Sequence, residues 1–374
     1  MKSAFTNNCG IEIFQVNILH VITGLQKAAG TSVFCGELCN GLVAMGHEIT
    51  IAVTKPEADD CYPIDSRIKI ISISSLIHCS TRATWSIIHI HALWAPQLHK
   101  VSQWAHANKI PVVWSPHGMM TPWAMHNKRL KKLVGWWLYQ RWDLSRTELL
   151  HVTAESELED VRRMGLKNKV VIAPLGVKIC NCVANAKCAD NEKVLLFVSR
   201  VQKKKGLVNL IKAWNKLPND VRLGWKVRIV GPDQDNHTAE LKLLCEELNV
   251  VRDFEFVGPK YGDELQSEYS SANLFVLPTY SENFGSVVIE SLAHSVPVIT
   301  TKGTPWQELE ERKCGWWIDI GVEPLTAALK EAMTLPEAER REMGVRGRIL
   351  VEEKYTWEAV ERVMLKGYED LLHG

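Results

Sequence analysis

Short apolar runs alternate with longer stretches of mixed polarity along most of the chain. In the first half these runs cover residues 16–22, 48–54, 87–90, 112–115 and 170–173, and in the second half residues 194–198, 226–230, 254–257 and 272–277. Apolar runs this short, bounded by Gly, Pro or polar residues, are typical of buried parallel strands, and the intervening stretches suit helices. The pattern predicts an α/β protein built on doubly wound parallel sheets.

The chain is long enough for two such sheets. A length of 374 residues exceeds what one core needs and is comfortable for two. A polar, Asn- and Cys-rich segment at residues 178–192 separates the two sets of runs and is typical of a linker or surface loop. We expect a first domain over residues 1–176, a second over residues 177–354, and a terminal helix over residues 355–374.

Composition narrows the functional class. The net charge of +1 gives no global field that would favour nucleic acid as a partner. No run reaches about 18 apolar residues, so we expect no membrane-spanning helix. Ten scattered cysteines and a start without a signal-like apolar core lead us to expect reduced thiols in the cytosol. Cys180, Cys182 and Cys188 lack the paired spacing of a zinc site, so we interpret them as loop residues.

A loop with two carboxylates follows the run at residues 272–277. Glu282 lies in this loop, and Glu290 lies on the second turn of the helix expected after it. We expect Ser286 to cap this helix, whose free first-turn N–H groups, around Gly285, suit an anion. Carboxylates for sugar hydroxyls beside amides for phosphate are what a nucleotide sugar requires. The alternative interpretation is a solvated helix residue and an ordinary loop charge.

A basic loop follows the run at residues 194–198. Ligands of open α/β sheets bind where the strands end, which places Arg200 and Lys205 at such a position. Arg can hold two phosphate oxygens at once, and Lys acts as a point charge. We therefore interpret this pair as candidate diphosphate ligands. The alternative is a solvated basic loop, and we interpret Lys203 and Lys204 in that way.

The first half offers fewer chemical candidates. The loop after residues 16–22 ends at Gly30, and we expect Thr31 to cap a helix there. The Gly-x-Gly-x-x-Gly fingerprint of dinucleotide binding is absent. The run at residues 112–115 leads into His117, which is our candidate site residue in this half; the alternative is a packing histidine.

Two more histidines lie on the strand expected at residues 87–90. His89 and His91 are two positions apart and so face the same side of the sheet. No cysteine or carboxylate lies close to them in the sequence, so we expect no metal site there.

Basic residues and tryptophans are interleaved over residues 123–142. The segment contains Lys128, Arg129, Lys131, Lys132 and Arg141, and no acid occurs from His117 to Trp142. Cations with indole rings on a helix suit an anionic membrane surface. The alternative is a helix that faces the core with its other side basic, and the sequence leaves both open.

Four motifs occur in an order that resembles retaining glycosyltransferases of the large family 4 type. They are Gly30, His117-Gly118, Arg200 with Lys205, and Glu282-x7-Glu290. The resemblance covers about residues 13 to 370. It implies the GT-B fold, with two facing doubly wound Rossmann-like domains, an acceptor-side N-terminal domain, a donor-binding C-terminal domain, and a reaction in the interdomain cleft. The terminal helix would cross back to the first domain.

The resemblance also implies a role for each motif. Arg200 and Lys205 would clamp the donor diphosphate, Gly30 would approach a phosphate, and His117 would bond the sugar. Glu290 would hold the ribose. Glu282, with the backbone of Asn283, Phe284 and Gly285, would orient the sugar, while Gly231 and Lys260 would lie near the base. Ser199 stands where the family usually has glycine, and Ala29 departs similarly near Gly30.

The resemblance implies a metal-independent enzyme that retains anomeric configuration, with no cofactor beyond its nucleotide-sugar co-substrate. Asp233 and Asp235 form an Asp-x-Asp motif, but metal-dependent glycosyltransferases of the other architecture carry theirs in the first half of the chain. We expect a UDP-sugar donor and a saccharide acceptor. The expected acceptor is lipid-linked and lies at the inner membrane face, as in bacterial lipopolysaccharide or O-antigen assembly. A nucleotide-sugar epimerase and a non-catalytic sugar-nucleotide binding module remain alternatives.

Overall fold

The computed structural model describes residues 4–6, 12–26, 30–56, 61–78, 85–126, 129–179 and 192–373, with side chains from residue 15 onward. The chain divides into two compact units, Met1–Gly176 with Trp357–Gly374, and Val177–Thr356. Tyr355 and Thr356, which we expected in the terminal helix, therefore belong to the second unit. The predicted loop cysteines Cys180, Cys182 and Cys188, and the basic residue Lys128, lie outside the described residues.

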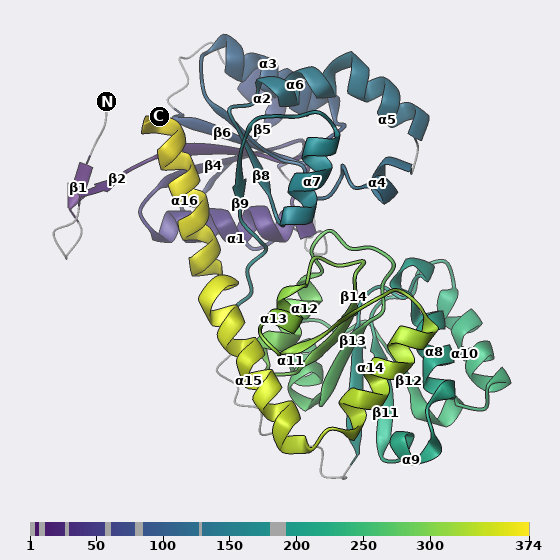
Figure 1. Cartoon of the computed structure of the whole chain (residues 1–374). Coiled ribbons are helices and arrows are strands. Elements are labelled where there is room, and N and C mark those ends of the chain that lie inside the picture. Colours follow the sequence, from purple (N-terminus) through teal and green to yellow (C-terminus); the bar gives the residue numbers. More distant parts are fainter. Residues whose placement is uncertain are drawn as a thin grey trace. The chain divides into compact units, whose positions relative to one another are not determined.

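The first unit contains a seven-stranded parallel sheet with the order β5-β4-β3-β6-β7-β8-β9 (Figure 1). Its strands are β3 (Asn17–Val21), β4 (Glu48–Val53), β5 (Lys69–Ser72), β6 (Ile87–His91), β7 (Val112–Ser115), β8 (Leu149–Val152) and β9 (Lys169–Ile172). Its helices include α1 (Gly30–Ala44), α2 (Ile73–His78), α3 (Pro96–Ala107), α7 (Glu155–Arg163) and α16 (Trp357–His373). A short antiparallel pair, β1 (Ala4–Thr6) and β2 (Glu12–Phe14), precedes this sheet.

The second unit contains a six-stranded parallel sheet with the order β12-β11-β10-β13-β14-β15. Its strands are β10 (Lys193–Val198), β11 (Trp225–Val230), β12 (Phe254–Gly258), β13 (Leu274–Leu277), β14 (Val298–Thr301) and β15 (Gly315–Ile318). Its α-helices are α8 (Leu207–Lys216), α9 (Asn219–Arg222), α10 (His237–Glu247), α11 (Gly262–Ser271), α12 (Ser286–Ala293), α13 (Glu308–Glu311), α14 (Val322–Thr334) and α15 (Glu337–Lys354). Both sheets confirm the predicted doubly wound α/β class.

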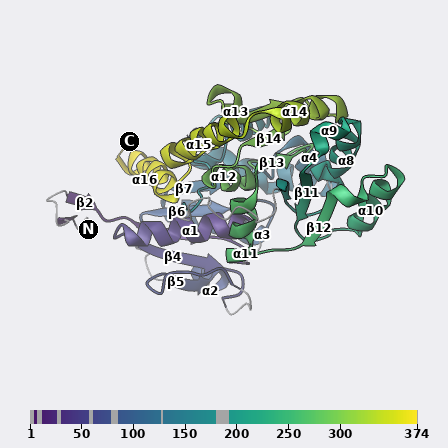
Figure 2. The same ribbon diagram turned by 90° about the horizontal axis from the view of Figure 1, so that it is seen from below.

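The terminal helix α16 completes the core of the first unit. It lies beside α1 in both views of the ribbon (Figures 1 and 2). Close approach is provided by Gly41, where any side chain would collide with the carboxylate of Glu361. Tyr368 is fully buried, and its hydroxyl lies 2.6 Å from Nδ1 of His89 on β6. A segment from the far end of the chain is thus part of the first unit's hydrophobic core.

Two predicted helix starts were wrong. The N-cap of α12 is Gly285, with φ of 81°, and no side chain caps the helix. Ser286 is the first helical residue. The turn from strand to helix is tight enough to need a left-handed residue, which glycine adopts at little cost. Likewise α1 already includes Gly30, ahead of Thr31.

The basic, Trp-rich segment is also not one continuous α-helix. It comprises α4 (Pro122–His126), α5 (Arg129–Gly135), a π-helical turn η1 (Trp136–Gln140) and α6 (Arg141–Arg146). None of the described helices is both long enough and apolar enough to cross a bilayer.

Replacing Tyr368 with Phe should lower the free energy of unfolding of the first unit by about 1–2 kcal/mol, because a buried imidazole nitrogen loses its partner. Urea unfolding with hydrogen exchange to locate the affected strands would measure this. Tyr355→Phe is the matched control, since the Tyr355 hydroxyl donates to Glu308 in the second unit. Loss of hydrogen-exchange protection in β10 and β11 for Tyr368→Phe would contradict the assignment of Tyr368 to the core of the first unit.

Candidate functional site

The second unit has its topological switch point between β10 and β13. These two strands are neighbours at the centre of the sheet, and the connections that leave them run toward opposite sides. Open parallel sheets bind ligands at this point, beyond the carboxyl ends of the strands. Two predicted motifs leave the sheet here, the basic loop after β10 and the carboxylate loop after β13.

The structure brings Lys205 and Glu282 together at this point. The Lys205 ammonium forms an ion pair and hydrogen bond with Oε1 of Glu282, and their side chains are 10% and 15% exposed. Thr279 also donates its hydroxyl to the same carboxylate oxygen, over 3.2 Å. Because a buried ammonium group needs a counter-charge, Glu282 holds Lys205 in place.

Gly206 allows the two loops to approach each other. Its φ is 74°, and a Cβ atom there would lie 1.9 Å from the carbonyl oxygen of Pro278. The loops are also joined by backbone bonds, since the N–H of Tyr280 donates to the carbonyl of Lys204 over 2.9 Å. The lysine-bearing turn (Lys203–Lys205) is therefore fixed against the end of β13.

Lys204 differs from the surface charge that we expected. It is half-buried, and this burial lowers the pKa of its ammonium group below the usual value. Lys203 is exposed as predicted and pairs with Glu240 at 3.3 Å.

Arg200 is exposed at the end of β10. Its guanidinium donates to the side-chain oxygen of Gln234 over 3.3 Å, so it reaches toward the loop after β11. Gly231 begins that loop, and a Cβ atom there would lie 1.9 Å from the carbonyl oxygen of Ser199. Asp233 accepts a bond from the backbone N–H of Thr238 at the start of α10, which gives the Asp-x-Asp motif a structural role.

The loop before α12 presents backbone more than side chains. Phe284 is buried, and its ring packs against Trp306 with ring centres 5.0 Å apart. The indole N–H of Trp306 donates to the Phe284 carbonyl over 2.6 Å, which fixes the turn that follows Asn283. At Gly285 the chain enters α12, whose first N–H groups have no helical acceptors.

Glu290 lies inside the unit at the second turn of α12. It accepts a hydrogen bond from the hydroxyl of Tyr269 over 2.8 Å. Burial raises the pKa of Glu290, although this hydrogen bond works in the opposite direction. Lys260 lies farther along the sheet, after β12, where it pairs with Glu264 at 3.3 Å.

His117 lies at the end of β7 in the first unit. Its φ is 52°, an uncommon conformation for a residue with a side chain, and Gly118 follows with φ of 72°. The N–H of Gly118 donates to Glu157 on α7 at short range. This bond fixes the turn, and the His117 ring is half-buried. Gly30 lies exposed at the start of α1, and beyond its chain neighbours no atom of the described residues lies within 4 Å of the position of a Cβ atom there.

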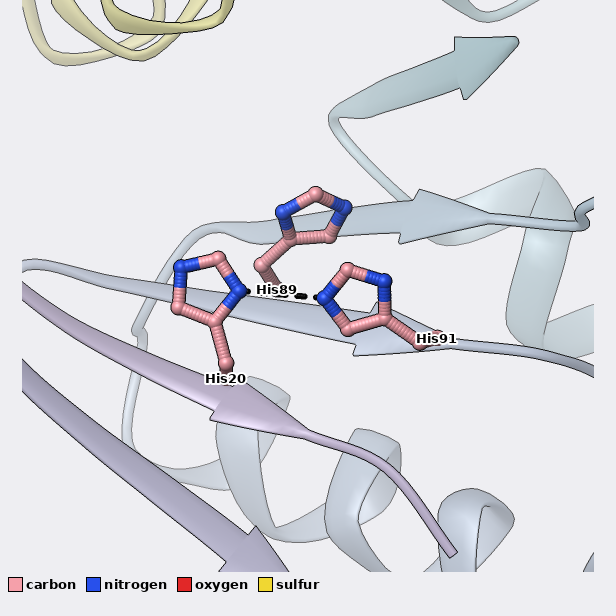
Figure 3. A group of neighbouring side chains, drawn as sticks. All are labelled: His20, His89 and His91. Carbon is pink, nitrogen blue, oxygen red and sulfur yellow. Dashed lines mark hydrogen bonds between the residues drawn. The ribbon is translucent and has the colours of Figure 1, made fainter. Parts of the chain in front are cut away.

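A group of buried histidines surrounds His117, and sequence reasoning missed most of it. His20 from β3 and His89 and His91 from β6 lie close together (Figure 3), and these three and His151 from β8 are all fully buried. Alternating residues of neighbouring parallel strands point to one face, which explains the assembly once the strand order is known. Only the pair on β6 is visible in the sequence, because the other rings come from distant segments.

No cysteine is near these histidines in the sequence, but the fold brings two cysteines close to the cluster. His20, Cys35 and Cys39 have metal-ligating atoms that all lie within 4.8 Å of one another, as do His20, His89 and His91. The two cysteines lie one turn apart on α1, which packs on this face of the sheet. Both nitrogens of His89 are already hydrogen-bonded within the protein.

Comparison with known proteins agrees with this architecture. Residues 28–179 match the model described as Glycosyltransferase Family 4, and residues 184–349 match the model described as Glycosyl transferases group 1. The chain belongs to the family 4-type glycosyltransferases. The two matched segments together cover most of both units, in the order that the resemblance predicted.

The curated relatives match this chain over only part of their own length. The D-inositol 3-phosphate glycosyltransferase of Corynebacterium jeikeium is 31% identical over 186 residues, which are 48% of this chain and 44% of that protein. The capsular polysaccharide biosynthesis glycosyltransferase CapM of Staphylococcus aureus is 29% identical over 185 residues, 47% of this chain and 46% of that protein. The chain therefore spans about half the length of these relatives.

Solved structures show the same fold at low sequence identity. HepE of Anabaena, solved in complex with UDP and glucose, has a TM-score of 0.73 and 12% identity, over 95% of this chain and 100% of that one. WaaG, a glycosyltransferase involved in lipopolysaccharide biosynthesis, has a TM-score of 0.69 and 17% identity, over 96% of this chain and 100% of that one. Both are GT-B neighbours of this chain.

Glu282→Gln should lower the free energy of unfolding of the second unit by about 1–3 kcal/mol, because it leaves the Lys205 ammonium without a counter-charge. Urea unfolding of the two proteins would measure the difference. Glu323→Gln is the matched control, since Glu323 pairs with Lys216 on the surface and should contribute less than about 1 kcal/mol. Equal effects from the two substitutions would show that the Lys205–Glu282 pair has no special role.

Proposed function

We propose that this protein transfers a sugar from a nucleotide-sugar donor, a UDP-sugar, to a saccharide acceptor with retention of anomeric configuration. The observation that carries this proposal is the Lys205–Glu282 pair at the switch point of the second unit, beside the start of α12. Cations, a carboxylate and free helix N–H groups meet there. This combination suits a diphosphate attached to a polyhydroxylated group.

The chemistry of the leaving group follows from these charges. As the bond between sugar and diphosphate breaks, negative charge develops on the diphosphate oxygens. Arg200 and Lys205 are the cations that would offset this charge, and preorganised donors of this kind contribute a few kcal/mol each. We infer that the two basic side chains replace a divalent metal, so the enzyme would need none.

The remaining predicted residues would hold the rest of the donor. Glu290 would receive the ribose hydroxyls in exchange for its bond with Tyr269. Glu282 would orient the transferred sugar, with the backbone of Asn283, Phe284 and Gly285 nearby in the same loop. Gly231 and Lys260 border the position proposed for the base, and His117 of the first unit would bond a saccharide. The HepE structure, which contains UDP and glucose, supports a donor of this class.

An exposed apolar stripe on the first unit supports a proposal for where the protein binds its acceptor. Along α5 and η1 it consists of Leu130, Leu133, Val134, Trp137 and Leu138, and Leu130 and Leu138 are 79% and 75% exposed. All five side chains are exposed, and they recur at intervals of three and four residues along the segment. The buried side of the same segment is a different face, which contains Trp136 and Gln140. A second apolar face on a surface segment is typical of a docking surface.

Positive charge borders this stripe. Arg129, Lys131, Arg141 and Arg146 are exposed on the same segment, and Arg141 stacks on Trp137 with its guanidinium carbon 4.8 Å from the ring centre. Cations beside an apolar face fit an anionic bilayer surface, where apolar groups enter the boundary of the acyl chains. We therefore propose peripheral binding to the inner face of the cytoplasmic membrane. The acceptor would then be a lipid-linked saccharide in surface polysaccharide or O-antigen assembly, as the likeness to CapM and WaaG also suggests.

A panel of UDP-, GDP- and ADP-sugars should identify the donor by thermal shift and by transfer or slow hydrolysis. We expect a shift with one UDP-sugar that persists in EDTA. Arg200→Ala should weaken this binding by roughly tenfold or more, because a charge-assisted contact is lost. Lys203→Ala is the control that should bind normally. A requirement for manganese would overturn the metal-free clamp, and product formed without any acceptor sugar would favour an epimerase.

Vesicle sedimentation tests the docking surface. Replacing Leu130, Trp137 and Leu138 with Ser should release the protein from vesicles containing anionic lipid, because three exposed apolar anchors are lost. The matched control replaces Leu223, Leu243 and Val345, which are also exposed, and should leave sedimentation unchanged. Donor-induced thermal shift should be normal in both triple variants. Unchanged binding of the first variant to vesicles would refute membrane docking by this stripe.

A further inference from the structure

Three imidazole rings form an unbroken chain that ends at His117. Nδ1 of His20 lies 3.0 Å from Nε2 of His91, and Nδ1 of His91 lies 3.0 Å from Nε2 of His117. Figure 3 shows the first of these contacts, with the His89 ring beside it. Nδ1 of His117 makes no hydrogen bond within the described part of the chain, and neither does Nε2 of His20. We call this an open chain, because the outer ring nitrogen at each end has no hydrogen bond among the described residues.

A second row of hydrogen bonds in the same cluster is a closed chain, which means that a backbone carbonyl fixes the proton at one end. Nε2 of His151 lies 2.8 Å from the carbonyl oxygen of Ala173, so this nitrogen must carry a proton. Nδ1 of His151 is then bare and accepts the hydroxyl proton of Ser115, over 2.6 Å. His89 donates from Nε2 to that hydroxyl oxygen and accepts at Nδ1 from Tyr368, each over 2.6 Å.

Every proton of this closed chain is fixed by one backbone carbonyl. Burial lowers the pKa of His151 to about 4 and that of His89 well below its usual value, so both rings are neutral at pH 7. The chain of His20, His91 and His117 has no such carbonyl at either end. The direction of its hydrogen bonds must be set in another way.

Counting protons limits the open chain to few states. Three neutral rings carry three protons, and each of the two N···N contacts holds one of them. The third proton must be at one of the two ends, either on Nδ1 of His117 or on Nε2 of His20. If the chain gains a fourth proton, both ends carry one.

Burial decides between the ends. Nε2 of His20 is buried with no hydrogen-bond partner in the described part of the chain, whereas His117 is half-buried. A proton on Nε2 of His20 would therefore be a buried donor without a good acceptor, since the nearby sulfur of the Cys35 thiol is only a weak acceptor. The bare nitrogen therefore lies on His20, and the third proton lies on Nδ1 of His117. If the thiol proton moves fully onto the chain, the chain holds four protons and His117 still has one on Nδ1.

We propose that His91 and His20 are positioning residues that keep a proton on Nδ1 of His117, so that His117 meets its ligand as a hydrogen-bond donor. The ligand atom is then an acceptor oxygen, from a sugar hydroxyl or a phosphate. This proposal rests on the proposed function, because it takes His117 as a ligand-binding residue. His20 and His91 are fully buried and act only through the chain.

Nitrogen-15 NMR of histidine-labelled protein measures the proton positions directly. The His117 signals, assigned with a His117→Gln variant, should show a protonated Nδ1 and a bare Nε2 at pH 7. His20→Leu removes the donor to His91, so the two tautomers of His117 should interconvert and both nitrogen signals should shift toward their average. His20→Asn keeps a side-chain N–H for His91 and should restore the wild-type pattern.

Tyr368→Phe is the matched control. It disturbs the closed chain and the stability of the first unit, but it leaves the open chain intact, so the His117 signals should not move. In transfer assays, His20→Leu should lower kcat/KM by about threefold to tenfold, the size expected for one hydrogen bond, and His20→Asn should recover most of it.

Two results would overturn the proposal. One is a bare Nδ1 with a protonated Nε2 on His117 in the wild type, and the other is an unchanged His117 pattern in His20→Leu. The spectra are recorded with and without EDTA, because a metal held by His20, Cys35 and Cys39 would direct the chain in place of protons and would equally contradict it. Absence of transfer with every donor would end the proposed function, and the NMR result would still decide the tautomer of His117.

Discussion

Burial of the Lys205 ammonium depends on one partner, the carboxylate of Glu282. The lysine comes from the loop after β10 and the glutamate from the loop after β13, so their contact joins the two strands at the switch point. Gly206 permits that contact by allowing the backbone of Pro278 to pass close by. A diphosphate would give Lys205 a second negative partner. Under the proposed function, the pair would keep the cation in position for the donor, at a cost that the ligand would offset.

The first unit also buries titratable side chains, but there the buried groups are neutral histidines. Four histidines are fully buried on one face of its sheet, and a charged imidazole there would be costly without an acid beside it. Hydrogen bonds among the rings, Ser115, Tyr368 and a backbone carbonyl satisfy most of their nitrogens. Tyr368 enters this cluster from the last helix. The hydrogen bond of Tyr368 adds to the apolar packing of Trp357, Val360 and Met364, which joins α16 to the core of the first unit.

The fold could be predicted from sequence because its signals are local. Each strand is a short apolar run between polar or glycine-containing turns, and β7 was predicted at its observed bounds. The helix start at Gly285 was misjudged because it depends on backbone conformation, where the sequence shows only a serine in a plausible position. The histidine cluster depends on strand order. His20 and His91 are adjacent because β3 pairs with β6, and no local pattern shows that pairing.

The Trp-rich segment shows a further limit of pattern reasoning. Apolar residues at helical spacing predict an amphipathic helix, but they do not show whether the apolar face is covered. In this segment both outcomes occur, because Trp136 is buried while Leu130 and Leu138 are largely exposed. The π-helical turn at Trp136–Gln140 adds a residue to the turn and shifts the faces relative to a regular α-helix. Which indoles face outward therefore follows from the local backbone, and the sequence alone could not separate a core-facing helix from a docking surface.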